Sequence, residues 1–215
     1  MNTDKKQALS VHLKAIRRML IVSVASVAVL FVLFFYLLCG PLVDFVLAPV
    51  RARGIEVITT SVSEALMMQF KVCLIAAVIA GMPVIIWQVW VFVAPALYPQ
   101  EKRLFAALFF VALLLFVGGV VFCYCLVFPM AIDLFWSAAD GVASTLWSVK
   151  EYFNFVLSFV LPFGLMFELP VVVYMLARRG LVTYQKLAHS RKYVILVIAI
   201  IAAILTPPDA VSQCM

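Results

Sequence analysis

Long uncharged stretches limit what this chain can become. Residues 19–38 contain no Asp, Glu, Lys or Arg, and about 20 residues of helix match the hydrocarbon core of a bilayer, which is about 30 Å thick. The whole chain is 67% hydrophobic and 12% charged, whereas a soluble domain is about half apolar. The sequence therefore excludes a soluble globule and predicts an all-α, polytopic transmembrane helical bundle.

We expect one transmembrane domain, 1–215, with an amphipathic lead-in over 1–18 and five spans near 19–38, 63–93, 104–132, 149–177 and 193–205. Two capping-box patterns, Ser61-Val62-Ser63-Glu64 and Ser148-Val149-Lys150-Glu151, predict where the second and fourth spans begin. The fifth span is short, since about 13 residues make about 20 Å of helix. An apolar trend resumes after it, so we expect that a sixth helix is missing and that the sequence is truncated.

A short apolar segment follows the first span. Cys39-Gly40-Pro41 interrupts the run, and residues 42–50 are too few to cross a bilayer. Pro49 lies near the end of this segment. We therefore expect the segment to lie on the far membrane surface as a cap.

The cations fall at the ends of the apolar runs, so we interpret the net charge of +6 as a topology signal and expect no nucleic-acid partner. Cytoplasmic loops carry the excess of Lys and Arg. The richer side holds Lys5, Lys6, Lys14, Arg17, Arg18, Lys102, Arg103, Arg178, Arg179, Lys186, Arg191 and Lys192, against Arg51, Arg53 and Lys150 on the other. The amino terminus is therefore expected in the cytoplasm.

The loop around residues 92–103, Phe-Val-Ala-Pro-Ala-Leu-Tyr-Pro-Gln-Glu-Lys-Arg, is the densest polar motif. Pro95 and Pro99 should end one helix and keep the loop stiff. It presents Glu101 beside Lys102 and Arg103, with Tyr98 suited to a membrane interface. This is either a docking surface or an acid in the first turn of a helix followed by membrane anchors; the residues alone favour the second.

Glu64, Lys71 and Glu168 are charged residues within the predicted spans that could have a function there. Glu168 is about 15 Å inside the membrane, where a carboxyl is costly. It either holds the bundle together by a hydrogen bond or lines a wet hollow that a substrate passes, and we favour the second. Glu64 and Lys71 share one helical face. The plainer alternative is that Glu64 only caps its helix, and that the aliphatic stem of Lys71 carries its ammonium group outward toward water.

The remaining reactive residues favour no catalytic site. His12 is isolated, and no nucleotide, zinc-hydrolase or nucleophile-elbow motif occurs. We expect no enzyme activity, cofactor or metal. The five cysteines contain no CxxC pair and mostly lie in or beside apolar runs, so packing is favoured over a disulfide or metal site.

The loop from Phe92 to Arg103, preceded by Gln88-Val89-Trp90, resembles the signature of the TatC family, the receptor subunit of the twin-arginine translocase. Further similar motifs follow the same order over nearly all of the chain. They are His12-Leu13 with Arg17, Ala48-Pro49, Ser63-Glu64-Ala65 with Lys71, Phe167-Glu168-Leu169-Pro170, and Leu205-Thr206-Pro207-Pro208-Asp209 with Gln213.

The resemblance implies a concave, glove-like receptor of six helices in the bacterial cytoplasmic membrane. It would bind Arg-Arg signal peptides of folded proteins in a complex driven by the protonmotive force. By this resemblance Glu101 engages the two arginines and Glu168 lines the hollow. Thr206 and Gln213 match positions that contact single-span TatA- and TatB-like partners, and the complex implies a homo-oligomer.

The chain departs from the family at Ala15. The motif in the family usually reads His-Leu-x-Glu-Leu-Arg, but Ala15 stands in the place of the Glu, next to Lys14. Losing an acid and gaining a cation should weaken attraction to a dicationic signal.

A proton-coupled small-solute transporter that uses Glu168 is the rival hypothesis. It predicts inverted repeats with paired broken helices, and the two halves show no such symmetry. A purely structural membrane scaffold is the third alternative.

Overall fold

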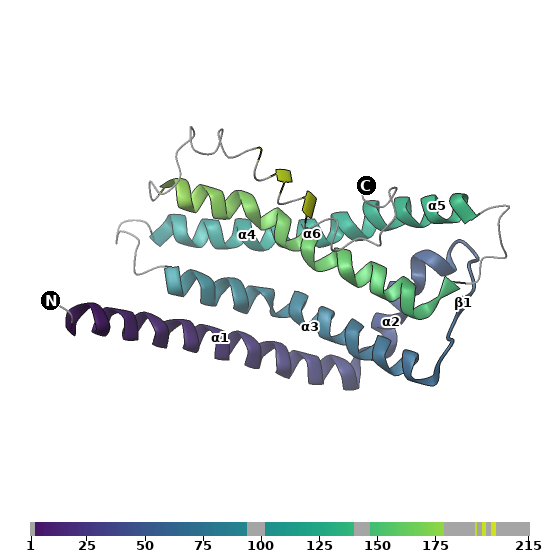
Figure 1. The fold of residues 1–215 in the computed structure, drawn as a ribbon, viewed down its shortest axis with the longest axis horizontal. Helices are drawn as coiled ribbons and strands as arrows, with labels where there is room; N and C mark the ends of the chain where they lie inside the picture. Colours follow the sequence, from purple (N-terminus) through teal and green to yellow (C-terminus); the bar gives the residue numbers. More distant parts are fainter. Residues whose placement is uncertain are drawn as a thin grey trace. The chain divides into compact units, whose positions relative to one another are not determined.

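The computed structural model describes residues 3–93, 102–139 and 147–178, together with residues 192, 195, 196, 199 and 200. Its elements in chain order are α1 (Thr3–Leu37), α2 (Cys39–Arg51), β1 (Val57–Ile58), α3 (Val62–Val93), α4 (Lys102–Phe122), the π-helix η3 (Cys123–Val127), α5 (Phe128–Ala139), β2 (Trp147–Ser148) and α6 (Val149–Arg178) (Figure 1).

Four helical stretches among the described residues are long and apolar enough to cross a membrane: Leu13–Leu37, Val62–Val91, Ala106–Ser137 and Val149–Arg178. They overlap the first four predicted spans. Most of the fifth span, 193–205, lies outside the described residues, and so do all the residues after it.

The lead-in over 1–18 is not a separate helix in the described residues. From Thr3 it continues into the first span as one unbroken helix, α1. Large apolar side chains of α1, such as Val29 and Tyr36, are exposed. That exposure suits a helix that faces lipid, because acyl chains are as apolar as these side chains.

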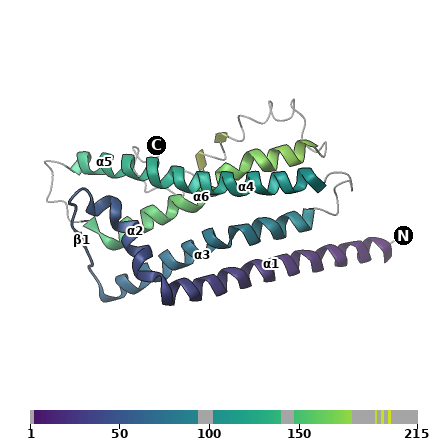
Figure 2. The ribbon, with the colours of Figure 1, turned by 180° about the vertical axis from the view of Figure 1, so that it is seen from behind.

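The chain divides into two compact units. Unit 1 comprises Met1–Phe45 and Gln69–Leu113, and so holds α1, most of α3 and the first part of α4. Helices α1 and α3 lie side by side in both ribbon views (Figures 1 and 2). Phe70 on α3 stacks on Phe35 of α1, with ring centroids 4.8 Å apart. Gly81 on α3 also lets α1 come close, because a β-carbon at this position would lie 3.2 Å from the side chain of Val27 on α1.

Unit 2 comprises Val46–Met68 and Leu114–Met215. Its core includes the fully buried side chains of Phe116, Phe128 and Phe153. Strands β1 and β2 pair in parallel, with Val57 opposite Trp147. This two-residue pairing was not predicted, because two residues are too few to leave a period-2 pattern in the sequence.

The π-helix η3 interrupts the third span. The backbone N–H of Phe128 donates to the carbonyl oxygen of Cys123, five residues back, instead of the usual four. Pro129 follows directly and has no N–H to donate to the carbonyl of Cys125. The irregular turn was not predicted, although Pro129 was a signal for it in the sequence.

Helix α3 begins at Val62, directly after Ser61 of the predicted capping box. The carboxylate of Glu64 also reaches Thr60, a partner that the capping-box pattern did not name. It accepts from the backbone N–H of Thr60 at 2.9 Å and from the Thr60 hydroxyl at 2.7 Å. The backbone N–H of Glu64 donates to the carbonyl of Ser61 at 3.1 Å, which closes the first turn.

Candidate functional site

The stems of the predicted receptor loop belong to unit 1. Helix α3 ends at Val93 and α4 begins at Lys102. Near these ends the ring of Trp87 on α3 meets the ring of Phe109 on α4 edge-on, with centroids 5.5 Å apart. The contact fixes the spacing of the two stems, and the loop between them holds Glu101.

The loop itself lies outside the described residues, and with it the predicted contacts Pro95, Tyr98 and Glu101. Thr206 and Gln213 also lie outside them. The backbones of four further predicted residues are placed in helices, but their side chains are not described: His12, Phe92, Lys102 and Arg103.

Two predicted receptor residues have described side chains. Gln88 on α3 is half-buried, and Arg17 on α1 is exposed. The amino-terminal part of α1 lies at the same end of unit 1 as the end of α3 and the start of α4 (Figures 1 and 2). The fold of unit 1 thus brings the segment around Arg17 to the end from which the loop emerges.

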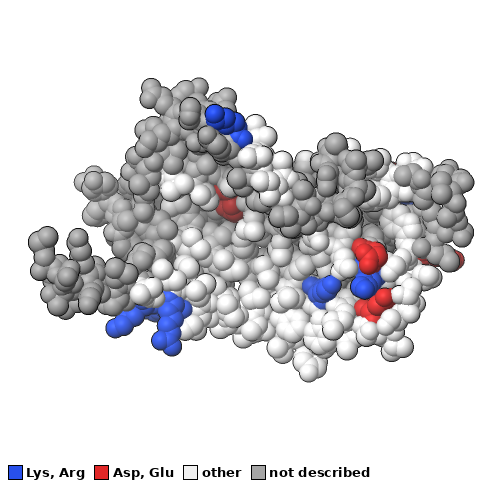
Figure 3. Space-filling model, viewed as in Figure 1, with Lys and Arg blue, Asp and Glu red and all other residues white. Residues whose placement is uncertain are grey.

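The exposed surface of α1 near this end is cationic. Lys14, Arg17 and Arg18 are all exposed, and so is Ala15 between them. Figure 3 shows blue atoms gathered over the amino-terminal part of α1, whereas the rest of the helix is white. A dicationic ligand would meet electrostatic repulsion at this surface.

Glu168 is the buried acid of unit 2. It lies on α6 and is half-buried, but its Oε1 atom is buried and has no hydrogen-bond partner among the described residues. Such atoms are uncommon, because a buried polar group without a partner costs free energy. A hydrogen bond to a bound ligand, a partner subunit or a water molecule would satisfy this buried oxygen.

The other two predicted intramembrane residues lie on α3. Glu64 is engaged by Thr60 at the start of the helix, and Lys71 is exposed further along it. Glu64 therefore has a structural role in starting α3, which was the plainer of the two alternatives.

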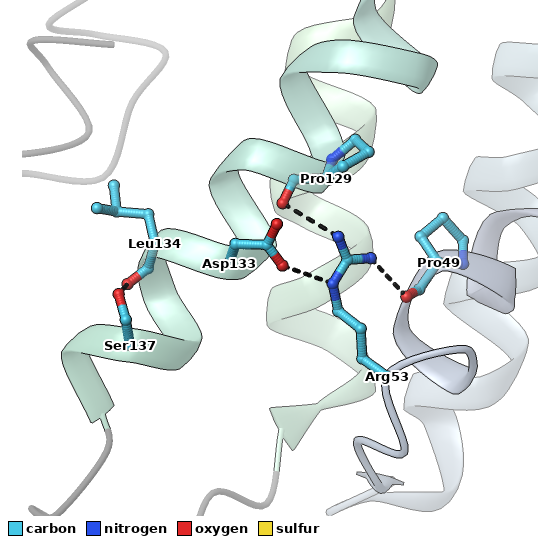
Figure 4. Close-up of polar contacts among 6 residues, drawn as sticks. All are labelled: Pro49, Arg53, Pro129, Asp133, Leu134 and Ser137. Atoms are coloured by element: carbon cyan, nitrogen blue, oxygen red, sulfur yellow. Dashed lines mark hydrogen bonds and ion pairs between the residues drawn. The ribbon is translucent and has the colours of Figure 1, made fainter.

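A polar cluster that was not predicted holds the cap segment in unit 2 (Figure 4). The guanidinium of Arg53 donates to Asp133 Oδ1 at 2.6 Å, to the carbonyl of Pro49 at 3.0 Å and to the carbonyl of Pro129 at 3.4 Å. Tyr152 on α6 donates to the carbonyl of Val46 at 2.7 Å. We name Pro49, Arg53, Pro129, Asp133 and Tyr152 the cap cluster; it ties α2 to α5 and to α6.

The turn after α2 explains why Arg53 can reach these partners. Gly54 adopts a positive φ of 69°, and the N–H of Ile55 donates to the carbonyl of Val50 while that of Gly54 donates to Arg51. This is a Schellman motif, which glycine permits and which ends a helix sharply. Arg53 then lies beside the last carbonyls of α2, which lack partners within the helix.

The hydrogen bond that Arg53 donates to Asp133, together with the negative charge of that carboxylate, raises the pKa of Arg53 above its usual value. Arg53 therefore stays charged at any physiological pH. The sequence contained one signal for this site, Arg53-Gly54 directly after an apolar segment, but no signal that named Asp133 as the partner.

The chain is similar to known proteins over almost its full length. The family model for the Sec-independent protein translocase protein (TatC) matches residues 11–215. The TatC protein of Carboxydothermus hydrogenoformans is 38% identical over 211 residues, which cover 98% of this chain and 86% of that protein. The chain belongs to the TatC family.

Further TatC proteins support the same assignment. That of Haemophilus influenzae is 34% identical and is covered over 84% of its length. A crystal structure of the twin-arginine translocase receptor TatC matches with a TM-score of 0.87 at 35% identity, over 94% of this chain and 90% of that one.

These matches confirm the resemblance inferred from the loop and confirm the helical, multi-pass fold class. As a TatC-family member, the chain is a component of a protein translocase. These matches do not support the rival small-solute transporter.

Proposed function

We propose that this TatC-family chain is the non-enzymatic receptor subunit of a twin-arginine translocase. It binds Arg-Arg signal peptides of folded proteins and nucleates a complex driven by the protonmotive force. The observation that carries the proposal is the match, at a TM-score of 0.87 over 94% of the chain, to a structure described as the twin-arginine translocase receptor.

The proposed binding site is the end of unit 1 where α3 and α4 are joined. Glu101 accepts the guanidinium groups, because a planar fork of N–H donors fits a carboxylate. The aromatic and proline residues Phe92, Pro95 and Tyr98 shape the loop, and Gln88 supports it from α3. His12, Arg17, Lys102 and Arg103 surround it and anchor this end at the membrane surface.

The proposed setting is the bacterial cytoplasmic membrane, with the amino terminus and the Glu101 loop in the cytoplasm. The bias of Lys and Arg toward that side supports this orientation. TatA- and TatB-like single-span subunits are the proposed partners, with Thr206 and Gln213 as docking positions, and several copies of the chain share one complex.

Peptide affinity in nanodiscs tests the proposal. A hydrogen bond to a charged group contributes about 1.5 to 3 kcal/mol, so Glu101→Ala should weaken binding of an Arg-Arg signal peptide by roughly 10-fold to 150-fold. Glu101→Asp should weaken it less, because the charge remains.

A Lys-Lys peptide is the matched control, because lysine cannot form the bidentate fork. It should bind more weakly than the Arg-Arg peptide to the unmodified chain and lose less on Glu101→Ala. If Glu101→Ala binds the Arg-Arg peptide as tightly as the unmodified chain does, Glu101 is only an anchor and the proposed site is wrong.

A further inference from the structure

The exposed side of α1 contains one continuous stripe within unit 1. From Lys14 to Tyr36, exposed residues recur every three or four positions, the spacing at which side chains share one face of a helix. The stripe runs through Lys14, Arg17, Ile21, Val24, Ala28, Val32 and Tyr36, with Arg18 beside Arg17. Its first part is cationic and the rest is apolar, which Figure 3 shows as a change from blue to white atoms along the helix.

The cations that begin this stripe, Lys14, Arg17 and Arg18, form what we name the α1 collar. They lie within about one turn of helix. The chain has no Asp or Glu between Asp4 and Asp44. Even Asp4 is ten positions before Lys14, about 15 Å along the helix, where salt screens most of the attraction between exposed charges. The acids of α1 therefore do not neutralise the collar.

Unit 1 as a whole is also cationic, since eight Lys and Arg stand against three Asp and Glu. An anion from outside the unit is the natural complement of such a surface, because opposite charges brought together lower the electrostatic free energy of both.

The apolar residues that follow the α1 collar select the kind of anion. Ile21 and Val24 are 55% and 65% exposed, and the apolar part of the stripe continues to Tyr36. A free phosphate ion or an acidic protein segment would cover the cations alone. A phospholipid covers both parts, because its phosphate meets the collar while an acyl chain lies along the apolar side chains. The apolar part is about 22 Å long, enough for one leaflet of hydrocarbon, which is about 15 Å thick.

We propose that the α1 collar and the apolar stripe that follows it bind an anionic phospholipid. Arg17 and Arg18 donate to the phosphate oxygens, since the planar guanidinium fork fits them, and Lys14 adds a point charge. A headgroup with a net negative charge, such as phosphatidylglycerol, is preferred to phosphatidylcholine, because the choline group brings a positive charge back to the collar.

Photoreactive lipids test the proposal on the full chain in phosphatidylcholine nanodiscs. Phosphatidylglycerol and phosphatidylcholine that carry the same diazirine-bearing acyl chain are added at equal trace amounts, and labelled peptides are identified by mass spectrometry. Phosphatidylglycerol should label residues 21–32 more strongly than phosphatidylcholine. Each cation at a membrane surface strengthens binding of an anionic lipid about 5-fold, so Lys14→Gln with Arg18→Gln should lower this preference about 30-fold. Arg17 stays intact because it also belongs to the proposed peptide site.

Arg51→Gln with Lys150→Gln is the matched control. It removes the same charge from exposed positions of unit 2 and should leave the labelling of residues 21–32 unchanged. On the unmodified chain, about 1 M NaCl should reduce the preference for phosphatidylglycerol, because salt screens the exposed collar. This arm does not depend on the folding of a variant.

Sodium phosphate at the ionic strength of the NaCl arm distinguishes a lipid headgroup from the free ion. It should compete no better than NaCl does. If it competes better, the collar takes free phosphate and the proposal is wrong. Equal labelling by the two lipids, or a preference that survives Lys14→Gln with Arg18→Gln, would overturn the proposal as well and point to an acidic protein segment. The readout is lipid labelling, so it can fail while Arg-Arg peptide binding succeeds, and the reverse.

Discussion

The backbones of α4 and α6 approach closely where Gly119 faces Gly164. A β-carbon on Gly119 would lie 3.1 Å from Gly164 Cα and 2.8 Å from the carbonyl oxygen of Phe163. Small residues at such crossings let helices in a membrane come near enough to gain van der Waals contact.

Gly119→Ala should destabilise unit 2, because the added methyl group meets backbone that cannot move aside. Forcing extra volume into a packed interior typically costs about 1–3 kcal/mol. The measurement is thermal unfolding in detergent. Gly118→Ala is the matched control, since nothing lies within 4 Å of a β-carbon there. Equal melting temperatures for the two variants would show that this crossing is not tight.

The contacts of the cap cluster predict that a substitution at Arg53 loosens this region more than a substitution at Asp133. Arg53→Gln removes the charged donor from three acceptors, whereas Asp133→Asn leaves the bonds to the Pro49 and Pro129 carbonyls in place. Arg53→Gln should therefore increase hydrogen exchange over 46–58 more than Asp133→Asn does. Asp133 is 64% exposed, so its own effect should shrink as salt rises. The opposite order would mean that the ion pair alone holds α2.

The sequence predicted the long helices well, since apolar runs bounded by charge, Pro or Gly leave little choice of element. It did not predict the cap cluster. Arg53 and Asp133 are 80 positions apart, and only the folded chain brings them together. The continuity of α1 was also missed, because the change from amphipathic to fully apolar character marks a change of surroundings and not a break in the backbone.

Glu168 should tolerate loss of its charge better than loss of its polarity. Its buried Oε1 has no partner among the described residues, and a buried charge without a partner would be costly. Glu168→Gln keeps the shape and a polar group, so export of a reporter with an Arg-Arg signal should be mostly retained. Glu168→Leu should reduce export further at equal amounts of protein in the membrane. If Gln and Leu reduce it equally, the carboxylate charge is what matters.

Restoring an acid at Ala15 should strengthen signal-peptide binding. Ala15 is exposed between cations on α1, and an exposed ion pair contributes about 0.2–1 kcal/mol, so Ala15→Glu should tighten binding by up to about 5-fold. The gain should be larger at low salt. Ala15→Gln is the control and should change affinity little. An equal gain with Gln would point to packing or hydrogen bonding in place of charge.

The proposed orientation predicts a pattern of labelling. With a single cysteine introduced at Gln100 in a cysteine-free background, a membrane-impermeant maleimide should react only from the cytoplasmic side. A cysteine at Ala143 should react only from the opposite side. The reverse pattern would overturn the topology and every site assignment that depends on it.

The unbroken length of α1 has a mechanical consequence. Its 35 residues make a rod about 52 Å long, while the hydrocarbon it crosses is about 30 Å thick. Roughly 20 Å of rigid helix must therefore stand beyond the hydrocarbon, mostly at the cationic end, and act as a lever. Rocking the membrane-embedded part through about 20° would carry the amino-terminal tip sideways by about 7 Å. A sideways force on the tip would be transmitted along α1 to its contact with Phe70 on α3.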